Sequence, residues 1–216
     1  MTRIIAGFAG SLILQVPRSG TRPTSDRVRE AIFSALESRD AIDGAAVLDL
    51  YAGSGALGLE AVSRGAAEAV LVERAKPAAD VCRRNADALK RRARGHAVRV
   101  SVAQKVVAAY LESARGPFGL VFIDPPYDLP EAALAHDLRL LAPLLADDAV
   151  VVVERGSRSA EPEWPAGISL DRRRDYGETT LWWATADLVD GPADDAALDD
   201  ETAEAPDQPA RPSQPA

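Results

Sequence analysis

Cysteine and histidine are scarce in this chain, which has one cysteine and two histidines among 216 residues. A lone cysteine, Cys82, cannot form a disulfide within the chain. The histidines, His96 and His136, are isolated in the sequence, so no Cys/His cluster is available to build a zinc site. The sequence therefore predicts a fold without a disulfide framework and without a bound metal.

Long apolar runs are also absent, since no run approaches the roughly 20 residues that a membrane-spanning helix needs. Residues 1–7 lack the longer apolar stretch of a signal peptide. Together with the single cysteine, these absences predict a cytoplasmic protein with no membrane partner. The length of 216 residues and the hydrophobic content of 47% predict one globular domain with a substantial core.

Basic residues are in deficit, because 33 acids against 25 lysines and arginines give a net charge of −8. The excess acid lies in residues 187–216, which hold nine acids and one base and leave 24 of each in residues 1–186. This segment is rich in Ala, Asp and Pro and has no large apolar residue after Leu198. It cannot bury enough surface to offset its ordering entropy, so we expect a disordered acidic tail behind a folded domain of residues 1–186.

Short apolar stretches alternate with amphipathic ones through most of that domain. Such alternation predicts an α/β fold with an open, mostly parallel sheet and helices on both faces. We expect strands at 46–50, 69–72, 98–102, 120–123 and 150–154, helices at 55–64, 77–92, 106–113 and 131–141, and an antiparallel pair at 169–175 and 179–184.

The N-terminal part differs from this pattern. Residues 4–5 and 12–16 are β-like and flank Gly7 and Gly10, which predicts a short hairpin. A helix follows, with Thr24 or Ser25 as its N-cap and apolar residues repeating along one face. We expect this extension of about 40 residues to precede the main sheet.

A glycine-rich loop follows the first long strand, where Gly53, Gly55 and Gly58 form a G-x-G-x-x-G pattern before a helix. Such glycines permit a tight turn and the close approach of a ligand to the backbone. Glu73 ends the next strand, 20 positions after Gly53, where a carboxylate can accept both hydroxyls of a ribose. Asp49, at the end of the first strand, suits a cofactor with an ammonium group and no pyrophosphate. The pattern favours S-adenosylmethionine over a nicotinamide or flavin cofactor, which is the main alternative; a turn without a ligand is the other.

A second loop carries Asp124-Pro125-Pro126-Tyr127, directly after a hydrophobic strand. Ligands of such sheets bind beyond the carboxyl ends of the strands, so this loop and the glycine loop are expected to share one crevice. The Asp124 carboxylate and the Pro125 carbonyl can accept the two N–H bonds of an exocyclic base amine, which directs the nitrogen lone pair to a methyl donor. Tyr127 can stack on a base turned out of its helix. A turn that closes a strand is the plain structural alternative.

Residues 3–7 (Arg-Ile-Ile-Ala-Gly), 20–30 (Gly-Thr-Arg-Pro-Thr-Ser-Asp-Arg-Val-Arg-Glu), 49–61 and the tetrad resemble the ribosomal RNA small-subunit methyltransferase D family. The resemblance runs from Arg3 to about Trp183. It implies a class I, Rossmann-like S-adenosylmethionine-dependent methyltransferase that acts as a monomer on the N2 amine of a guanine in 16S rRNA, guanine-966. The resemblance also implies that this RNA is presented in an assembled or partly assembled small subunit.

The resemblance and the motifs define the candidate site. The tetrad of residues 124–127 is the candidate catalytic loop. One departure concerns the adenine of the cofactor. Many related enzymes place an acid after the third strand to accept a hydrogen bond from the adenine amino group, but residues 101–106 contain no acid. Either Gln104 or a backbone carbonyl accepts that bond, or the adenine is held less specifically. The candidate cofactor residues are Asp49, Tyr51, Ala52, Gly53, Ser54, Gly55, Gly58, Glu73, Arg74, Gln104 and Asp124, and the candidate RNA-binding residues are Arg3, Thr21, Arg22, Arg27 and Arg29. For Arg22, Arg27 and Arg29, the resemblance also leaves open a role in closing over the cofactor.

Other functions remain open from the sequence alone. The glycine loop and the tetrad are shared with methyltransferases that act on adenine N6 or on a protein amide. A non-catalytic RNA-binding assembly factor and a nicotinamide dehydrogenase are two further alternatives. Basic clusters at 83–94 and 172–174 fit either phosphate contacts or solvated surface faces.

Overall fold

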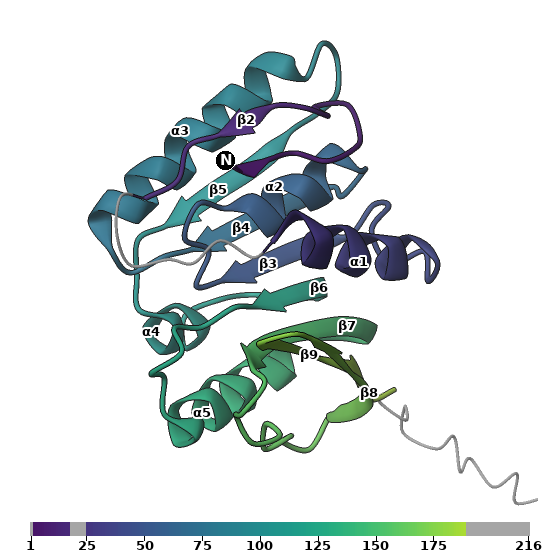
Figure 1. The fold of residues 1–216 in the computed structure, drawn as a ribbon, viewed down its shortest axis with the longest axis vertical. Coiled ribbons are helices and arrows are strands. Elements are labelled where there is room, and N and C mark those ends of the chain that lie inside the picture. The colour runs from purple at the N-terminus through teal and green to yellow at the C-terminus, as the bar shows by residue number, and fades with distance from the viewer. Residues whose placement is uncertain (1, 18–24, 189–216) are drawn as a thin grey trace, which may run out of the picture.

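A seven-stranded sheet forms the centre of the computed structural model, which describes residues 2–17 and 25–188 (Figure 1). The strand order is β5-β4-β3-β6-β7-β9-β8, with parallel pairing from β5 to β7 and antiparallel pairing of β9 with both β7 and β8. The order reverses between β3 and β6, which is where such sheets open a crevice for ligands. The strands are β3 (Ala46–Leu50), β4 (Glu68–Val72), β5 (Arg99–Ala103), β6 (Phe118–Ile123), β7 (Leu145–Gly156), β8 (Ile168–Tyr176) and β9 (Thr179–Ala186).

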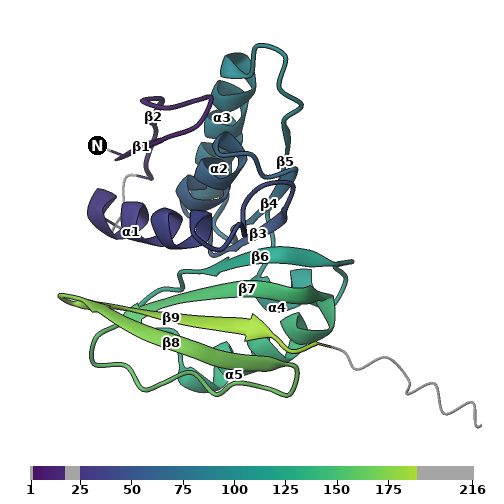
Figure 2. The ribbon, with the colours of Figure 1, turned by 90° about the vertical axis from the view of Figure 1, so that its right-hand side faces the viewer.

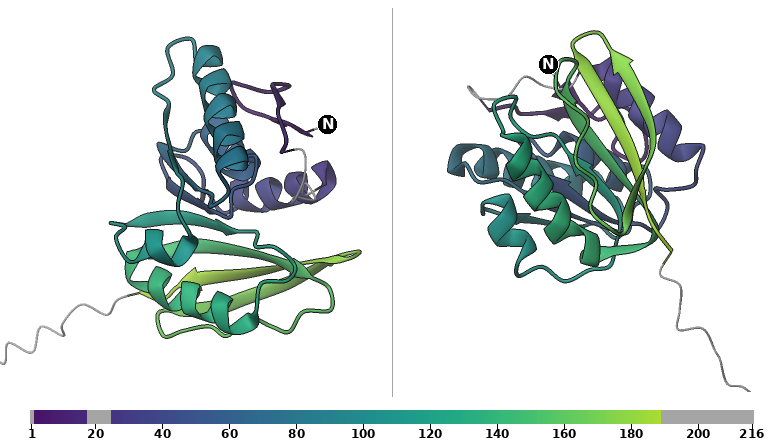
Figure 3. Two further views of the ribbon diagram at one scale, coloured as in Figure 1. Left: turned by 90° about the vertical axis from the view of Figure 1, so that its left-hand side faces the viewer. Right: turned by 90° about the horizontal axis from the view of Figure 1, so that it is seen from below.

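Helices cover both faces of the sheet, as Figures 2 and 3 show. One face carries α1 (Asp26–Glu37), α2 (Ala56–Ser63) and α3 (Lys76–Arg92), and the other carries α4 (Val107–Leu111) and α5 (Glu131–Leu141), with the 3-10 turn η1 (Ala142–Leu144) after it. Two separate clusters of buried residues result, one on each side of the sheet. The predicted α/β architecture with helices on both faces is confirmed.

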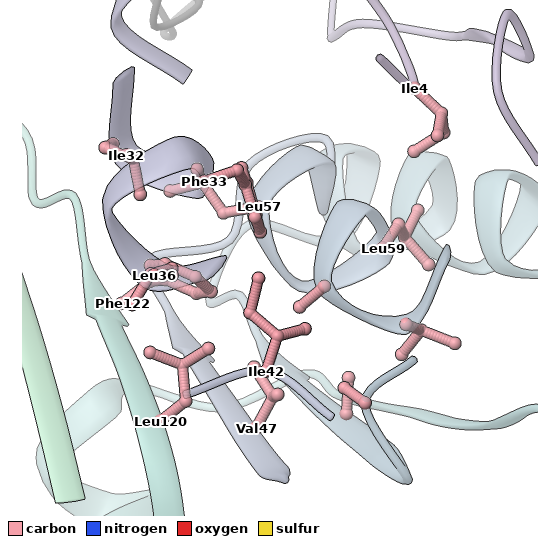
Figure 4. Packing of buried hydrophobic residues seen from close by; sticks show 14 of the residues in the cluster. Ile4, Ile32, Phe33, Leu36, Ile42, Val47, Leu57, Leu59, Leu120 and Phe122 are labelled. Carbon is pink, nitrogen blue, oxygen red and sulfur yellow. The ribbon is translucent and has the colours of Figure 1, made fainter. Parts of the chain in front are cut away.

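Helix α1 begins where the sequence places a cap. The Ser25 hydroxyl accepts a hydrogen bond from the Val28 amide at 3.2 Å, so Ser25 and not Thr24 is the N-cap. The apolar side of α1 then packs on the sheet, with the Phe33 and Phe122 rings 5.7 Å apart. Figure 4 shows Ile32, Phe33 and Leu36 of this helix in one cluster with Leu120 and Phe122 of β6.

The predicted N-terminal hairpin is present, with β1 (Thr2–Arg3) antiparallel to β2 (Ile13–Leu14). Its first strand lies at 2–3 instead of 4–5: the Ile4 amide still donates to the Leu12 carbonyl at 2.9 Å, but the amides of Ile5 and Ala6 donate to the buried Glu60 carboxylate of α2 at 2.6 and 3.0 Å. The hairpin is therefore fixed to the helix that follows the glycine loop.

Most helices and strands begin and end within two residues of the expected positions, and β7 differs most. Strand β7 extends over 145–156 instead of 150–154, because it is paired with β6 on one side and with β9 on the other. Helix α4 is shorter, ending at Leu111. The predicted disordered tail lies outside the described residues from position 189 onward. Within the described ranges, no helix is long and apolar enough to cross a membrane.

Candidate active site

A cavity of about 580 Å³ opens at the carboxyl ends of β3, β4 and β6, where the strand order reverses. Its walls come from the glycine loop, the end of β4, the start of α4, the loop after β6, and the N-terminal part with α1. The lining includes these predicted site residues: Arg29, Asp49, Tyr51, Ala52, Gly53, Ser54, Glu73, Arg74, Asp124, Pro125, Pro126 and Tyr127. The two motif loops thus share one cavity.

Five predicted residues do not line it within the described chain: Arg3, Arg27, Gly55, Gly58 and Gln104. Arg3 and Arg27 are exposed on β1 and α1. Thr21 and Arg22 lie outside the described residues.

Gly55 and Gly58 serve helix packing. A Cβ added to Gly55 would come within 2.7 Å of the Leu71 side chain, and one added to Gly58 would come within 2.4 Å of it. These glycines therefore allow α2 to approach β4 closely. Gly55 also has a φ of +77°, in the left-handed region that favours glycine. Neither glycine lines the cavity, and their predicted contact with a ligand stays a prediction.

The Asp49 side chain is the buried acid at the centre of the site. It is 1% exposed, and its Oδ2 accepts a hydrogen bond from the Gly58 amide at 2.9 Å. Burial raises the pKa of Asp49 to about 7, against the lowering effect of the Gly58 hydrogen bond, and the charge of Glu73 raises it further. A cationic group that enters the cavity beside this carboxyl would favour its ionised form.

Glu73 shapes the glycine loop as well as the cavity. Its Oε2 accepts a hydrogen bond from the Gly53 amide at 3.0 Å, and its Oε1 accepts one from the Ala75 amide at 2.7 Å. Each carboxylate oxygen has two acceptor positions, so each keeps one for a ligand hydroxyl. The side chain is 9% exposed, on the cavity wall.

The glycine loop contains a non-glycine residue in the left-handed region, Tyr51, with a φ of +63°. The Tyr51 hydroxyl donates a short hydrogen bond to Asp137 of α5. Burial, with this bond, raises the pKa of Tyr51, so the hydroxyl stays protonated and remains a donor. Asp137 is a functional-site neighbour that the sequence did not identify, since it is a single polar residue on an amphipathic helix.

The Asp124 loop continues from β6. The Asp124 amide donates to the Leu50 carbonyl at 3.4 Å, and the Leu129 amide donates to the Pro126 carbonyl at 2.9 Å, which closes a turn. The buried Arg155 guanidinium of β7 donates to the Leu129 carbonyl at 3.0 Å and to Glu131 at 2.6 Å. Arg155 therefore holds the far end of this loop, a role that its position in the sequence does not reveal.

Tyr127 is exposed over 58% of its surface although it lines the cavity. The backbone of Gly156 lies beside the ring, since a Cβ built there would be 3.4 Å from the Tyr127 Cδ1. An aromatic ring supported on one side and open to solvent on the other is suited to stacking on a planar ligand.

The part of the cavity wall formed by Ala75, Ala78 and Val106 is apolar. Gln104 is exposed and does not line the cavity, while Val106, 57% exposed, and Ala75 and Ala78 do. Contact of Gln104 with a cofactor is therefore not favoured by this geometry, and apolar side chains take its place on the wall.

Comparisons with known proteins identify relatives of this chain. Residues 2–185 match the family described as Conserved hypothetical protein 95. The chain is 38% identical to Ribosomal RNA small subunit methyltransferase D of Escherichia coli (strain K12), over 82% of this chain and 85% of that protein.

Solved structures confirm the class I methyltransferase fold. The structure of yhhF from Escherichia coli superposes with a TM-score of 0.74 at 34% identity, over 87% of this chain and 99% of that chain. Magnesium protoporphyrin IX methyltransferase from Synechocystis PCC 6803, solved with S-adenosylmethionine bound, gives a TM-score of 0.57 at 14% identity, over 77% and 86% of the two chains. At that identity the second likeness shows the fold alone.

Proposed function

The chain belongs to the ribosomal RNA small subunit methyltransferase D family, and we propose that it transfers a methyl group from S-adenosylmethionine to an exocyclic amine of ribosomal RNA. The acceptor we propose is N2 of a guanine in 16S rRNA, guanine-966, presented by an assembled or partly assembled small subunit to a monomer of this protein. The observation that carries the proposal is the shared cavity, in which the Asp124 loop faces the two buried acids Asp49 and Glu73.

The cavity residues fit S-adenosylmethionine. Asp49 is a buried carboxyl whose pKa burial raises to about 7, and an ammonium group is the complement that such a site lacks. Glu73 keeps two free acceptor positions, which match the two hydroxyls of a ribose. Arg74, Ala75, Ala78 and Val106 would hold the adenine. When bound there, the cofactor supplies an electrophilic methyl group on a sulfonium.

Asp124 and Pro125 would orient the acceptor amine. The lone pair of an exocyclic base amine is delocalised into the ring, so the amine is a weak nucleophile. Two acceptors, the Asp124 carboxylate and the Pro125 carbonyl, would bind its two N–H bonds and turn the lone pair out of the ring plane. The carboxylate also stabilises positive charge that develops on the nitrogen, and it can take the proton afterwards. Tyr127 would stack on the base once it leaves the RNA helix.

The RNA itself would contact the exposed N-terminal part. Arg3 and Arg27 are exposed beside the cavity's N-terminal wall and carry the positive charge that phosphates need. With Thr21 and Arg22, they define the RNA-facing extension of the proposed methyltransferase domain, residues 1–186, behind which we propose an acidic tail at 187–216.

The test is transfer of labelled methyl groups to small subunits from cells that lack this gene. We expect one methyl group per subunit with the wild-type protein and a loss of at least a hundredfold with Asp124→Asn, which removes the carboxylate charge. Asp147→Asn is the matched control, because Asp147 is exposed and does not line the cavity.

Nuclease digestion of the labelled product identifies the acceptor. Label in N2-methylguanosine supports the proposal. Label in N6-methyladenosine or in ribosomal protein would place the chain among the other enzymes that share these loops. If no subunit preparation accepts a methyl group while the protein binds S-adenosylhomocysteine, the proposed function is wrong.

A further inference from the structure

Arg29 of α1 is almost fully enclosed, at 1% exposure, in the wall of the cavity. Its Nη2 donates to Asp26 at 2.6 Å, and Asp26 is half-exposed in the first turn of the same helix. The other two guanidinium nitrogens, Nε and Nη1, are buried and have no hydrogen-bond partner among residues 2–17 and 25–188, which the structure describes. A buried donor without an acceptor is costly, and a guanidinium has no means of losing its proton.

A buried guanidinium with unpaired nitrogens is expected where a bound ligand supplies the missing hydrogen-bond acceptors. Native structures satisfy nearly all buried polar groups, and the exceptions call for a missing partner. The partner for Arg29 must be an acceptor, and an anion gives the strongest hydrogen bonds to a guanidinium. It must also be small enough to enter the cavity.

Most parts of the methyl donor, S-adenosylmethionine, already have a proposed binding residue in the cavity. In the proposed function, Glu73 would bind the ribose, Val106 would contact the adenine, and Asp124 would act on the acceptor amine beside the methyl group. The amino-acid part of S-adenosylmethionine is what remains, and it has one ammonium and one carboxylate. Besides Glu73, the buried charged side chains of the described cavity wall are Asp49 on β3 and Arg29 on α1, and these two are not paired with each other.

We propose that Arg29 binds the carboxylate of the methionine part of S-adenosylmethionine, as the counterpart of Asp49 at its ammonium group. The inference rests on the proposed function, since it takes this cofactor as the donor. The proposal separates Arg29 from its neighbour Arg27. The two are in one arginine-rich segment, yet Arg27 is exposed, where an RNA phosphate could reach it, and Arg29 is enclosed. A backbone phosphate of a structured RNA stays at the surface and does not reach such a position.

Calorimetry with two ligands tests this assignment. S-Adenosylhomocysteine has the carboxylate, and 5′-methylthioadenosine has the adenosine and sulfur without the amino-acid part. With Arg29→Met, we expect the affinity for S-adenosylhomocysteine to fall about 10- to 100-fold, the loss typical of a buried charge-assisted hydrogen bond. The affinity for 5′-methylthioadenosine should stay within about twofold, which also shows that the variant is folded. Arg27→Met is the control and should bind both ligands like the wild type.

Two results would overturn the proposal. One is equal affinity of the wild type and Arg29→Met for S-adenosylhomocysteine. If Arg29→Met also lost RNA methylation in that case, Arg29 would be assigned to RNA binding instead. The other is an equal loss for both ligands. If Arg29→Met does not fold, Arg29→Lys takes its place. The affinity of Arg29→Lys should fall threefold or more for S-adenosylhomocysteine and stay unchanged for 5′-methylthioadenosine. Failure of the wild type to bind S-adenosylhomocysteine would instead contradict the proposed function.

Discussion

Asn85 of α3 holds the backbone of Gln15 at both of its polar groups. The Asn85 Oδ1 accepts from the Gln15 amide and its Nδ2 donates to the Gln15 carbonyl, both at 2.9 Å. The same Nδ2 donates to the Ser54 carbonyl of the glycine loop at 2.8 Å. One buried side chain therefore joins the N-terminal hairpin to the loop that lines the cavity, and Val16, next along the chain, is itself part of the lining.

Asn85→Ala should destabilise the protein by about 2–3 kcal/mol, because it leaves partly buried backbone groups of two segments without partners. The measurement is urea-induced unfolding followed by circular dichroism. Arg84→Ala is the control: Arg84 also binds Gln15, through an exposed side-chain hydrogen bond of 2.8 Å, and should cost no more than about 0.5 kcal/mol. Equal costs for the two variants would show that the hairpin is not anchored by Asn85.

Asp49 should make cofactor binding depend on pH. Its pKa is raised from 3.8 to about 7 by burial, so the ligand-free protein binds a proton there that the unfolded chain does not. The free energy of unfolding of the ligand-free protein therefore falls as the pH rises from 3.8 to about 7. An ammonium group beside Asp49 favours the carboxylate, so affinity for S-adenosylhomocysteine should rise with pH up to about 7, with release of up to one proton.

Calorimetry at pH 6 in two buffers of different ionisation enthalpy counts that proton. Asp49→Asn should bind more weakly, release no proton and lose the pH dependence below 7. Unchanged proton release in Asp49→Asn would assign the effect to another group.

The bond between Tyr51 and Asp137 should support the left-handed turn of the glycine loop. Tyr51→Phe removes the donor and leaves a buried carboxyl whose pKa burial already raises. We expect a loss of about 1–3 kcal/mol in unfolding free energy at pH 8, and less at low pH, where the Asp137 carboxyl is protonated. In a double-mutant cycle, Tyr51→Phe combined with Asp137→Asn should cost less than the two single changes together. Additive costs would contradict direct coupling.

Much of the fold follows from local pattern. Apolar runs at 46–50 and 118–123 become the central strands, and the Ser25 cap sets the start of α1. Hydrophobic period and capping act over a few residues, so a single sequence reveals them. The length of β7 could not be predicted from local pattern, because its ends are fixed by pairing with two strands that are distant in the sequence.

The site was predictable in its motifs but not in its supports. Arg27 and Arg29 look alike in the sequence, yet in the fold Arg29 is enclosed and Arg27 is exposed. Gly55 matches a ligand-binding pattern, yet Leu71, on the next strand, explains why it is glycine. Asn85 likewise is one polar residue on an amphipathic helix. These roles depend on contacts between distant segments, which a local pattern does not encode.

Tyr127 should contribute through its ring and not through its hydroxyl. Base stacking on an aromatic side chain is worth about 1–3 kcal/mol, so Tyr127→Ala should lower kcat/KM for the small subunit roughly 5- to 100-fold. Tyr127→Phe keeps the ring beside Gly156 and should stay within about threefold of the wild type. Methyl transfer measured at subsaturating subunit concentration gives these ratios, and S-adenosylhomocysteine binding confirms that the cofactor part of the cavity is intact. If the phenylalanine variant loses as much as the alanine variant, the hydroxyl has a role in orienting the base, and stacking alone does not explain the exposed position of this side chain.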